Sequence, residues 1–188
     1  MGHDSAGRRT LIADTVITVL ASSGSRGLTH RAVDAAAGLP AGSASYYFRT
    51  REALLAAAAV RLADLDLAAA GQLPPPRTRE DLLGALAGMV LAQSGEFRER
   101  TIARYQLSLE AERYPQVHAA LAAMGERFTA AAAQLLARLG AADARRDARA
   151  LIAACAGLVF ESTAGGQRPY SADEVAELLG DLLAARLG

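Results

Sequence analysis

The sequence predicts an all-α fold of about nine helices, and three observations support this fold class. Apolar residues recur at spacings of three and four residues along most of the chain, which is the period of an amphipathic helix. No run alternates between apolar and polar residues as a half-buried strand does. The breaks between periodic segments are short and rich in Gly, Pro or Ser, as in "SSGSRG" and "GQLPPPRTRED".

The first 70 residues are expected to form four helices. The first has an apolar stripe and ends at the two glycines of "SSGSRG". Thr29 is placed to cap the second helix, which ends at Gly38, and Thr50 is placed to cap the fourth. A short third helix lies between them. The expected ranges are Arg8 to Ser23, Thr29 to Ala37, about Gly42 to Phe48, and Thr50 to about Ala70.

Five further helices are expected after a linker at 71–77, where three successive prolines cannot continue a helix. Thr78 with Asp81 and Ser171 with Glu174 have the spacing of a capping box, which marks the start of a helix. The expected ranges are about 78–94, 96–113, 115–139, 144–164 and 171–187.

Composition excludes several classes of protein. Of the 188 residues 52% are apolar, so a disordered chain is excluded, and a net charge of zero excludes a uniformly basic protein that coats nucleic acid. The single cysteine excludes an internal disulfide framework. No apolar run reaches the roughly 20 residues that cross a bilayer, and the start lacks a hydrophobic signal core. We therefore expect a cytoplasmic protein without a membrane partner.

Residues 29–48 have the spacing of a helix-turn-helix unit. Two short helices are joined by a turn that contains Gly38, which permits positive φ, and Pro40. The second helix begins with the small residues of "GSAS", so it can approach a duplex closely. In a major groove, serine hydroxyls can reach several base edges and an alanine can contact a thymine methyl.

The same stretch resembles the TetR-like (tetracycline-repressor-like) family of transcriptional regulators. The matching residues extend over about 10–58 and are Leu28-Thr29, Val33, Ala37-Gly38-Leu39, Gly42-Ser43, Tyr46-Tyr47-Phe48, Thr50-Arg51-Glu52 and Leu54. The resemblance implies a DNA-binding domain at 1–55 and a helical ligand-binding and dimerisation domain at 56–188. It further implies a homodimeric repressor that a small-molecule effector releases from a palindromic double-stranded DNA operator.

Carried over to this chain, the resemblance implies roles for individual residues. Thr29 and Arg51 would touch phosphates, residues 43–46 would lie in the groove, and Phe48 would pack beneath them. For Arg49 two roles remain open, a phosphate contact or a solvated position on the surface. The predicted DNA-binding residues are Thr29, Gly42, Ser43, Ala44, Ser45, Tyr46, Tyr47, Arg49, Thr50 and Arg51.

The C-terminal helices carry candidates for self-association and ligand binding. Wide apolar stripes on the last two helices predict a dimer interface at Leu151, Leu158, Val175, Leu178, Leu179 and Leu182; the alternative is that they face only their own core. The middle helices carry apolar, aromatic and polar side chains that could line a sensor pocket. For each of these residues the alternative is an ordinary position in the core or on the surface. These pocket candidates are Met89, Gln93, Phe97, Tyr105, Leu109, His118, Met124 and Phe128.

Two other functions are weighed against a regulator. An enzyme has little support, because Cys155 sits in the apolar segment "AACAG" and the three histidines are scattered along the chain. No spacing typical of a metal site or a cofactor site occurs, so neither group is expected. The second alternative is a helical ligand-binding or interaction module whose DNA reader is vestigial.

Overall fold

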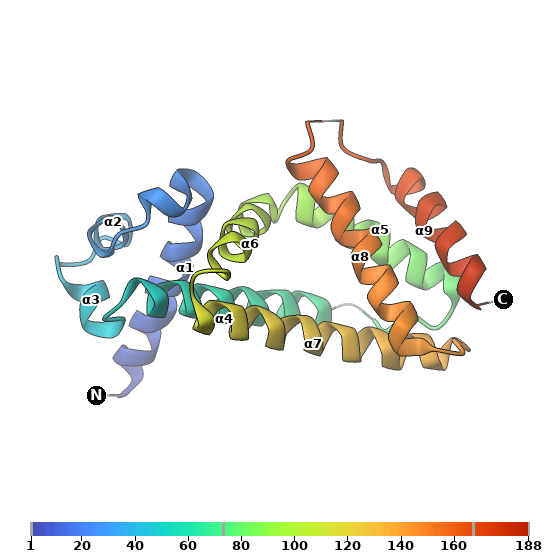
Figure 1. Ribbon diagram of the computed structural model, residues 1–188, viewed down its shortest axis with the longest axis horizontal. Helices are drawn as coiled ribbons and strands as arrows, with labels where there is room; N and C mark the ends of the chain where they lie inside the picture. The colour runs from blue at the N-terminus through green and yellow to red at the C-terminus, as the bar shows by residue number, and fades with distance from the viewer. Residues whose placement is uncertain (1, 73, 167, 188) are drawn as a thin grey trace. The chain divides into compact units, whose positions relative to one another are not determined.

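A computed structural model describes residues 2–72, 74–166 and 168–187, with side chains described between residues 5 and 184. Leu73, in the expected linker, lies outside these ranges. The described residues form nine helices and no strand, which confirms the predicted fold class (Figure 1). The helices are α1 Gly2–Gly27, α2 His30–Ala36, α3 Ser43–Tyr47, α4 Arg51–Gly71, α5 Arg79–Ser94, α6 Arg98–Glu110, α7 Pro115–Arg138, α8 Ala144–Thr163 and α9 Ala172–Leu187.

The first helix differs most from expectation. It begins at Gly2 rather than at Arg8, so the two arginines at positions 8 and 9 lie within the helix. The predicted break at "SSGSRG" is present as a kink, because Gly24 has a non-helical backbone with φ 65° and ψ −177°. Gly24 thus supplies the left-handed conformation that separates the main helix from its last turn.

The predicted helix starts are confirmed by their capping bonds. The hydroxyl of Thr29 accepts from the Ala32 amide over 3.0 Å, and that of Thr50 accepts from the Ala53 amide over 3.1 Å. At the start of α5, Thr78 and Asp81 form the expected reciprocal capping box. These side chains satisfy amide groups that have no partner within the helix.

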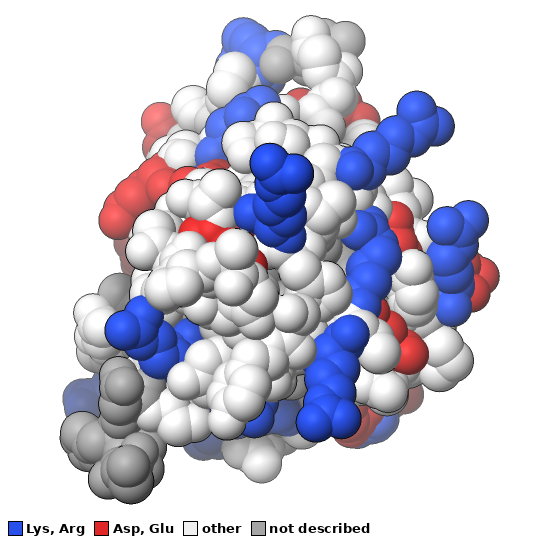
Figure 2. Space-filling view, turned by 90° about the vertical axis from the view of Figure 1, so that its left-hand side faces the viewer, with Lys and Arg blue, Asp and Glu red and all other residues white. Residues whose placement is uncertain are grey.

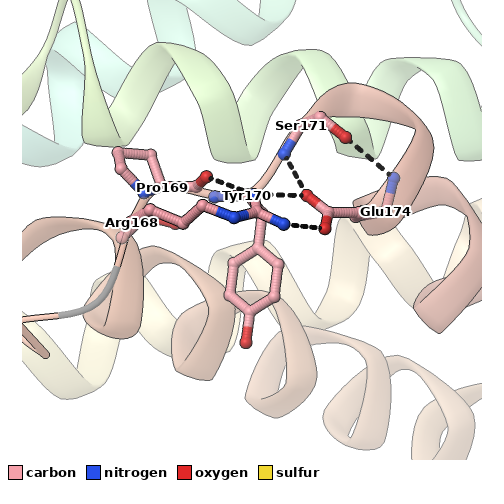
Figure 3. A network of polar contacts seen from close by, with 6 residues as sticks. Arg168, Pro169, Tyr170, Ser171 and Glu174 are labelled. Carbon is pink, nitrogen blue, oxygen red and sulfur yellow. Dashed lines mark hydrogen bonds and ion pairs between the residues drawn. The ribbon is translucent and has the colours of Figure 1, made fainter.

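The start of α9 carries a second capping box with an added arginine (Figure 3). Glu174 accepts from the Ser171 amide over 2.8 Å, and the Ser171 hydroxyl accepts from the Glu174 amide over 3.3 Å. Arg168 donates to both carboxylate oxygens of Glu174. The hydrogen bond from Arg168, followed by that from the Ser171 amide, lowers the pKa of Glu174 to about 2.

The chain divides into two compact units. Unit 1 comprises residues 1–72 and 99–124, and unit 2 comprises residues 73–98 and 125–188. In unit 1, apolar residues of α1 to α4, α6 and α7 form one core. Its large fully buried members include Ile12, Val16, Leu20, Leu28, Val33, Leu54, Leu55, Leu62 and Leu107.

The second core lies in unit 2 and is built from α5, the C-terminal part of α7, α8 and α9. Its buried members include Leu82, Val90, Leu136, Leu151, Cys155, Val159, Val175, Leu179 and Leu183. Burial raises the pKa of the Cys155 thiol to about 11. Cys155 is therefore a thiol with little thiolate at neutral pH, as its apolar sequence context predicts.

The division by packing places α4 in unit 1 together with α1 to α3. The domain boundary expected between residues 55 and 56 stays a prediction. Helix α4 packs on α1 through a face that includes Leu54, Leu55 and Leu62. Arg61 of α4 also donates to both carboxylate oxygens of Asp14 on α1, over 2.7 and 3.2 Å. Helix α4 is consequently part of the same compact unit as α2 and α3.

Candidate nucleic-acid interface

Two glycines shape the turn that joins α2 to α3. Gly38 and Gly42 have φ of 64° and 92°, a region that other residues rarely adopt. Pro40 lies between them, and its carbonyl accepts from the Ser43 amide over 3.1 Å. The positive φ predicted for Gly38 is thus present, and helix α3 begins directly after a second left-handed residue, Gly42.

Asp34 of α2 fixes the start of α3. The residue is 4% exposed, and its carboxylate accepts from the Gly42 amide over 2.8 Å and from the Ala44 amide over 2.7 Å. A buried carboxylate that accepts two backbone hydrogen bonds is well satisfied, and it neutralises the donors at the helix tip. The sequence analysis did not identify Asp34. The available signal was an acid on the inward side of α2, next to buried Val33, just before a glycine turn.

The exposed face of α3 consists of Gly42, Ser45 and Tyr46. Tyr46 is 79% exposed, and a glycine at position 42 leaves the neighbouring surface open. Ser43 is half-buried. The prediction for Ala44 is wrong: its side chain is 0% exposed and packs in the core of unit 1, so its methyl group cannot reach a thymine.

The C-terminal end of α3 is held by two other helices. Phe48 is half-buried against the core, as predicted, and its carbonyl accepts from His30 Nε2 of α2 over 2.7 Å. The Arg9 guanidinium of α1 lies over the rings of Tyr47 and Phe48, with its carbon 5.6 and 5.4 Å from their centroids. Tyr47 is half-buried and meets Tyr46 edge to face, with the ring centroids 5.1 Å apart. These contacts fix the direction in which Tyr46 projects.

Arg51 points into the protein, whereas the resemblance implied a phosphate contact. It donates to the carbonyl and to the hydroxyl of Ser25, both over 2.6 Å, and to the Leu28 carbonyl. Its guanidinium also lies 3.9 Å from the Glu110 carboxylate of α6. These partners hold the guanidinium at the junction of α1, α4 and α6, and the phosphate contact implied for Arg51 stays a prediction.

Ser25 extends this contact into a polar network, which we call the Ser25 node. The Ser25 hydroxyl donates to Glu110, and the Ser25 amide donates to the Gln106 amide oxygen over 3.4 Å. The node thus joins the end of α1, the start of α4 and the C-terminal end of α6. A second contact between α4 and α6 is the pair formed by Asp66 and Arg104. Burial raises the pKa of the Asp66 carboxyl, and the facing Arg104 opposes this rise.

The remaining predicted DNA-binding residues lie on the surface. Thr29, Arg49 and Thr50 are exposed, as are Arg26 and Arg31. Figure 2 views the side on which α1 to α3 lie in Figure 1, and it shows a broad uncharged area with blue basic side chains around it and some red acidic ones at its upper left and right. An uncharged contact area bordered by arginines suits a duplex, because bases are read at the centre and phosphates are bound at the rim.

The predicted pocket residues are divided between the two units. Met89, Gln93, Phe97 and Phe128 belong to unit 2, and each is half-buried. Of the four in unit 1, Tyr105 and Met124 are half-buried, whereas Leu109 and His118 are exposed. Leu109 borders an open depression with Glu110, Glu112 and Arg113. Burial raises the pKa of the Tyr105 phenol.

The predicted dimer residues also separate into two groups. Leu151, Val175 and Leu179 are buried in the core of unit 2, so they are not available to a second copy of the chain. Leu178 is 49% exposed, and Phe160, on the other C-terminal helix, is 46% exposed. Leu158 and Leu182 are half-buried. An outward-facing apolar surface thus remains on α8 and α9.

Groups of metal ligands and membrane-spanning helices are both absent from the described part of the chain. Between residues 5 and 184, with the gaps given above, no three His, Cys, Asp or Glu side chains are grouped as metal ligands. None of the described helices combines the length and hydropathy of a bilayer span.

Comparison with known proteins identifies relatives along almost the whole chain. Residues 77–185 match a family model described as tetracyclin repressor-like, C-terminal domain. The multidrug binding protein EbrR, solved with ethidium, is 30% identical over 93% of this chain and 98% of its own, with a TM-score of 0.76. A TetR-family member from Streptomyces coelicolor A3, SCO1917, is also 30% identical, over 93% and 97%, with a TM-score of 0.75.

A third solved structure supports the fold alone. A transcriptional regulator from Rhodococcus sp. Rha1 has a TM-score of 0.83 at 20% identity, over 95% of each chain. No curated protein matches the sequence.

Proposed function

Because the chain belongs to the tetracycline-repressor-like family of transcriptional regulators, we propose that it is a homodimeric repressor that a small molecule releases from its DNA operator. The observation that carries this proposal is the exposed face of α3. Tyr46 projects 79% exposed beside Gly42 and Ser45, on a helix that α1 and α2 hold in place. A short, rigid helix with a small, polar face suits entry into a major groove.

Two-fold symmetry of the protein must be mirrored in the DNA, so the proposed operator is an inverted repeat with half-sites one helical turn or more apart. The exposed apolar residues Phe160 and Leu178 support a dimer formed through α8 and α9. Binding to genomic DNA would place this function in the cytoplasm, and it requires no catalytic group.

The small-molecule effector is proposed to bind in the helical body of the chain. EbrR binds ethidium, a flat aromatic molecule. This chain has half-buried aromatic side chains at Phe97 and Phe128 in unit 2. Aromatic side chains in an apolar surrounding favour a ligand of the same kind.

Helix α6 is the proposed connection between the effector and the reading helix. It contacts α4 through Asp66 and Arg104, and it contacts the end of α1 through the Ser25 node. Movement of α6 would therefore change the support of α2 and α3. An effector that binds the DNA-incompetent conformation better by about 3 kcal/mol would weaken operator binding roughly a hundredfold.

The direct test measures binding of the full-length protein to labelled duplexes from the DNA that flanks its own gene, by fluorescence anisotropy at moderate salt. We expect specific binding to an inverted repeat, and we expect Tyr46→Ala to weaken it by about tenfold or more. The matched control is Leu109→Ala, which removes a similarly exposed apolar side chain from α6. Equal binding of all duplexes, or equal affinity of the two variants, would contradict the proposal.

A second measurement tests the response to an effector. Ethidium is titrated into the complex of protein and operator, with the free labelled duplex as a control for direct intercalation. We expect a fall in anisotropy at concentrations that leave the free duplex unchanged. If the protein is released only at ethidium concentrations that also change the anisotropy of the free duplex, the result would argue against an effector of this class.

A further inference from the structure

The Ser45 hydroxyl donates its proton to a hydrogen bond within the protein. Ser45 Oγ lies 2.9 Å from the carbonyl oxygen of Gly42, one turn earlier. A carbonyl oxygen only accepts, so the shared proton belongs to the serine. The two lone pairs of Ser45 Oγ remain for a partner outside the helix, and the side chain is exposed. In this conformation Ser45 is a hydrogen-bond acceptor.

The other polar groups at the start of α3 are occupied in the same way. The Ser43 hydroxyl donates to the Pro40 carbonyl over 2.6 Å, and the Ser43 amide donates to the same oxygen over 3.1 Å. The amides of Gly42 and Ala44 donate to the buried Asp34 carboxylate. The tip of α3 therefore presents an accepting oxygen next to three amides that already have partners.

Bases differ in what they offer to such an acceptor. In the major groove, the adenine N6 and cytosine N4 amino groups are donors, whereas guanine O6 and N7 and thymine O4 are acceptors. To donate to guanine or thymine, Ser45 must break its bond to Gly42, which leaves that carbonyl without this partner. The net value of one hydrogen bond corresponds to a preference of roughly 2- to 10-fold.

We propose that Ser45 reads its base by accepting a hydrogen bond, so that the base it contacts in each half-site is adenine or cytosine. This inference rests on the proposed DNA-binding function and adds to it a rule for one operator position. Ser45 acts here as a specificity-determining residue, whereas Asp34 and Gly42 position it.

The experiment begins with selection of operators from a random duplex library by the full-length protein and by Ser45→Ala. The position whose base preference relaxes in Ser45→Ala identifies the contacted base. Ser108→Ala is the matched control, because it removes an exposed hydroxyl that also donates to a carbonyl one turn earlier, on α6. We expect Ser108→Ala to leave the preference at that position unchanged.

The contacted amino group is then removed chemically. Adenine is replaced by purine, or cytosine by 2-pyrimidinone, at the identified position. The wild-type protein should lose roughly 2- to 10-fold in affinity, and Ser45→Ala should lose almost nothing. If the base is adenine, replacement by 7-deazaadenine, which lacks only the N7 acceptor, should leave wild-type binding unchanged.

Three results would overturn the inference while leaving DNA binding intact: guanine or thymine as the contacted base, no effect of removing the amino group, or no position relaxed by Ser45→Ala. Failure of the wild-type protein to select any duplex would instead refute the proposed function, and the inference with it. Circular dichroism of each variant separates these results from a loss of fold.

Discussion

The Arg51 guanidinium donates to both the carbonyl and the hydroxyl of Ser25, each over 2.6 Å, across the junction of α4 and α1. The first residue of α4 is thereby bonded to the kinked end of α1. The Ser25 hydroxyl in turn donates to Glu110 of α6, so three helices meet at one serine. A charged donor with several acceptors at such a junction stabilises it more than an exposed ion pair does.

Replacement of Arg51 is therefore expected to destabilise unit 1. Arg51→Ala removes the donor from two carbonyls and one hydroxyl, and we expect it to lower the free energy of unfolding by about 1–3 kcal/mol. Arg49→Ala, at an exposed position two residues earlier, should change it by about 0.5 kcal/mol or less. Urea denaturation followed by circular dichroism measures both. Equal stability of the two variants would show that the node contributes nothing to folding.

Asp34 is expected to stabilise the start of α3. Asp34→Asn keeps one accepting oxygen and turns an amide toward a backbone N–H, so about 1–2 kcal/mol of stability should be lost. Hydrogen exchange of the Gly42 and Ala44 amides should accelerate together. The exposed Asp64→Asn is the control. Unchanged protection of both amides in Asp34→Asn would contradict the assigned role.

The apolar surface of α8 and α9 is expected to hold the dimer together. Phe160→Glu places a charge at a side chain that is 46% exposed in the single chain, and it should convert a dimer into a monomer at micromolar concentration. Leu109→Glu, at a 75% exposed position on α6, should leave the dimer intact. Size-exclusion chromatography with light scattering distinguishes these states. A monomeric wild-type protein would rule out the proposed assembly.

The cap of α9 is expected to weaken in acid. The Glu174 pKa is about 2 in the folded protein, below its ordinary value of 4.5. A carboxyl group whose pKa is lowered by folding stabilises the folded protein at pH values above its pKa in the unfolded chain. This contribution is lost as the pH falls from about 4.5 to about 2. Carbon-13 NMR of the carboxyl should give a midpoint near 2 in the wild type and a higher one in Arg168→Ala. An ordinary midpoint in the wild type would disprove the pairing.

Sequence reasoning located those parts of the structure that depend on neighbouring residues. Thr29, Thr50, Thr78 and Ser171 all cap helices as expected, because a cap needs only a hydroxyl and an amide three residues away. The glycine turn before α3 was predictable for the same reason.

Contacts between distant residues were not predictable in this way. Asp34 and Arg51 acquire their roles from partners on other segments, and nothing in their local sequence fixes those partners. The apolar stripes on α8 and α9 were too wide to show which side chains face inward. The sequence therefore could not distinguish the buried Val175 from the exposed Leu178. Ala44 was misassigned because a small residue suits both a groove and a tight core.

The residues that hold α3 in place and the residues that it exposes lie on different sides of this helix. Asp34, His30 and Arg9 bind its backbone or its inner aromatic residues, whereas Ser45 and Tyr46 face outward. If α3 reads DNA as proposed, substitutions at 45 and 46 should change operator choice with little loss of folding stability. These two positions are then the natural ones to randomise when engineering a regulator with a new DNA target.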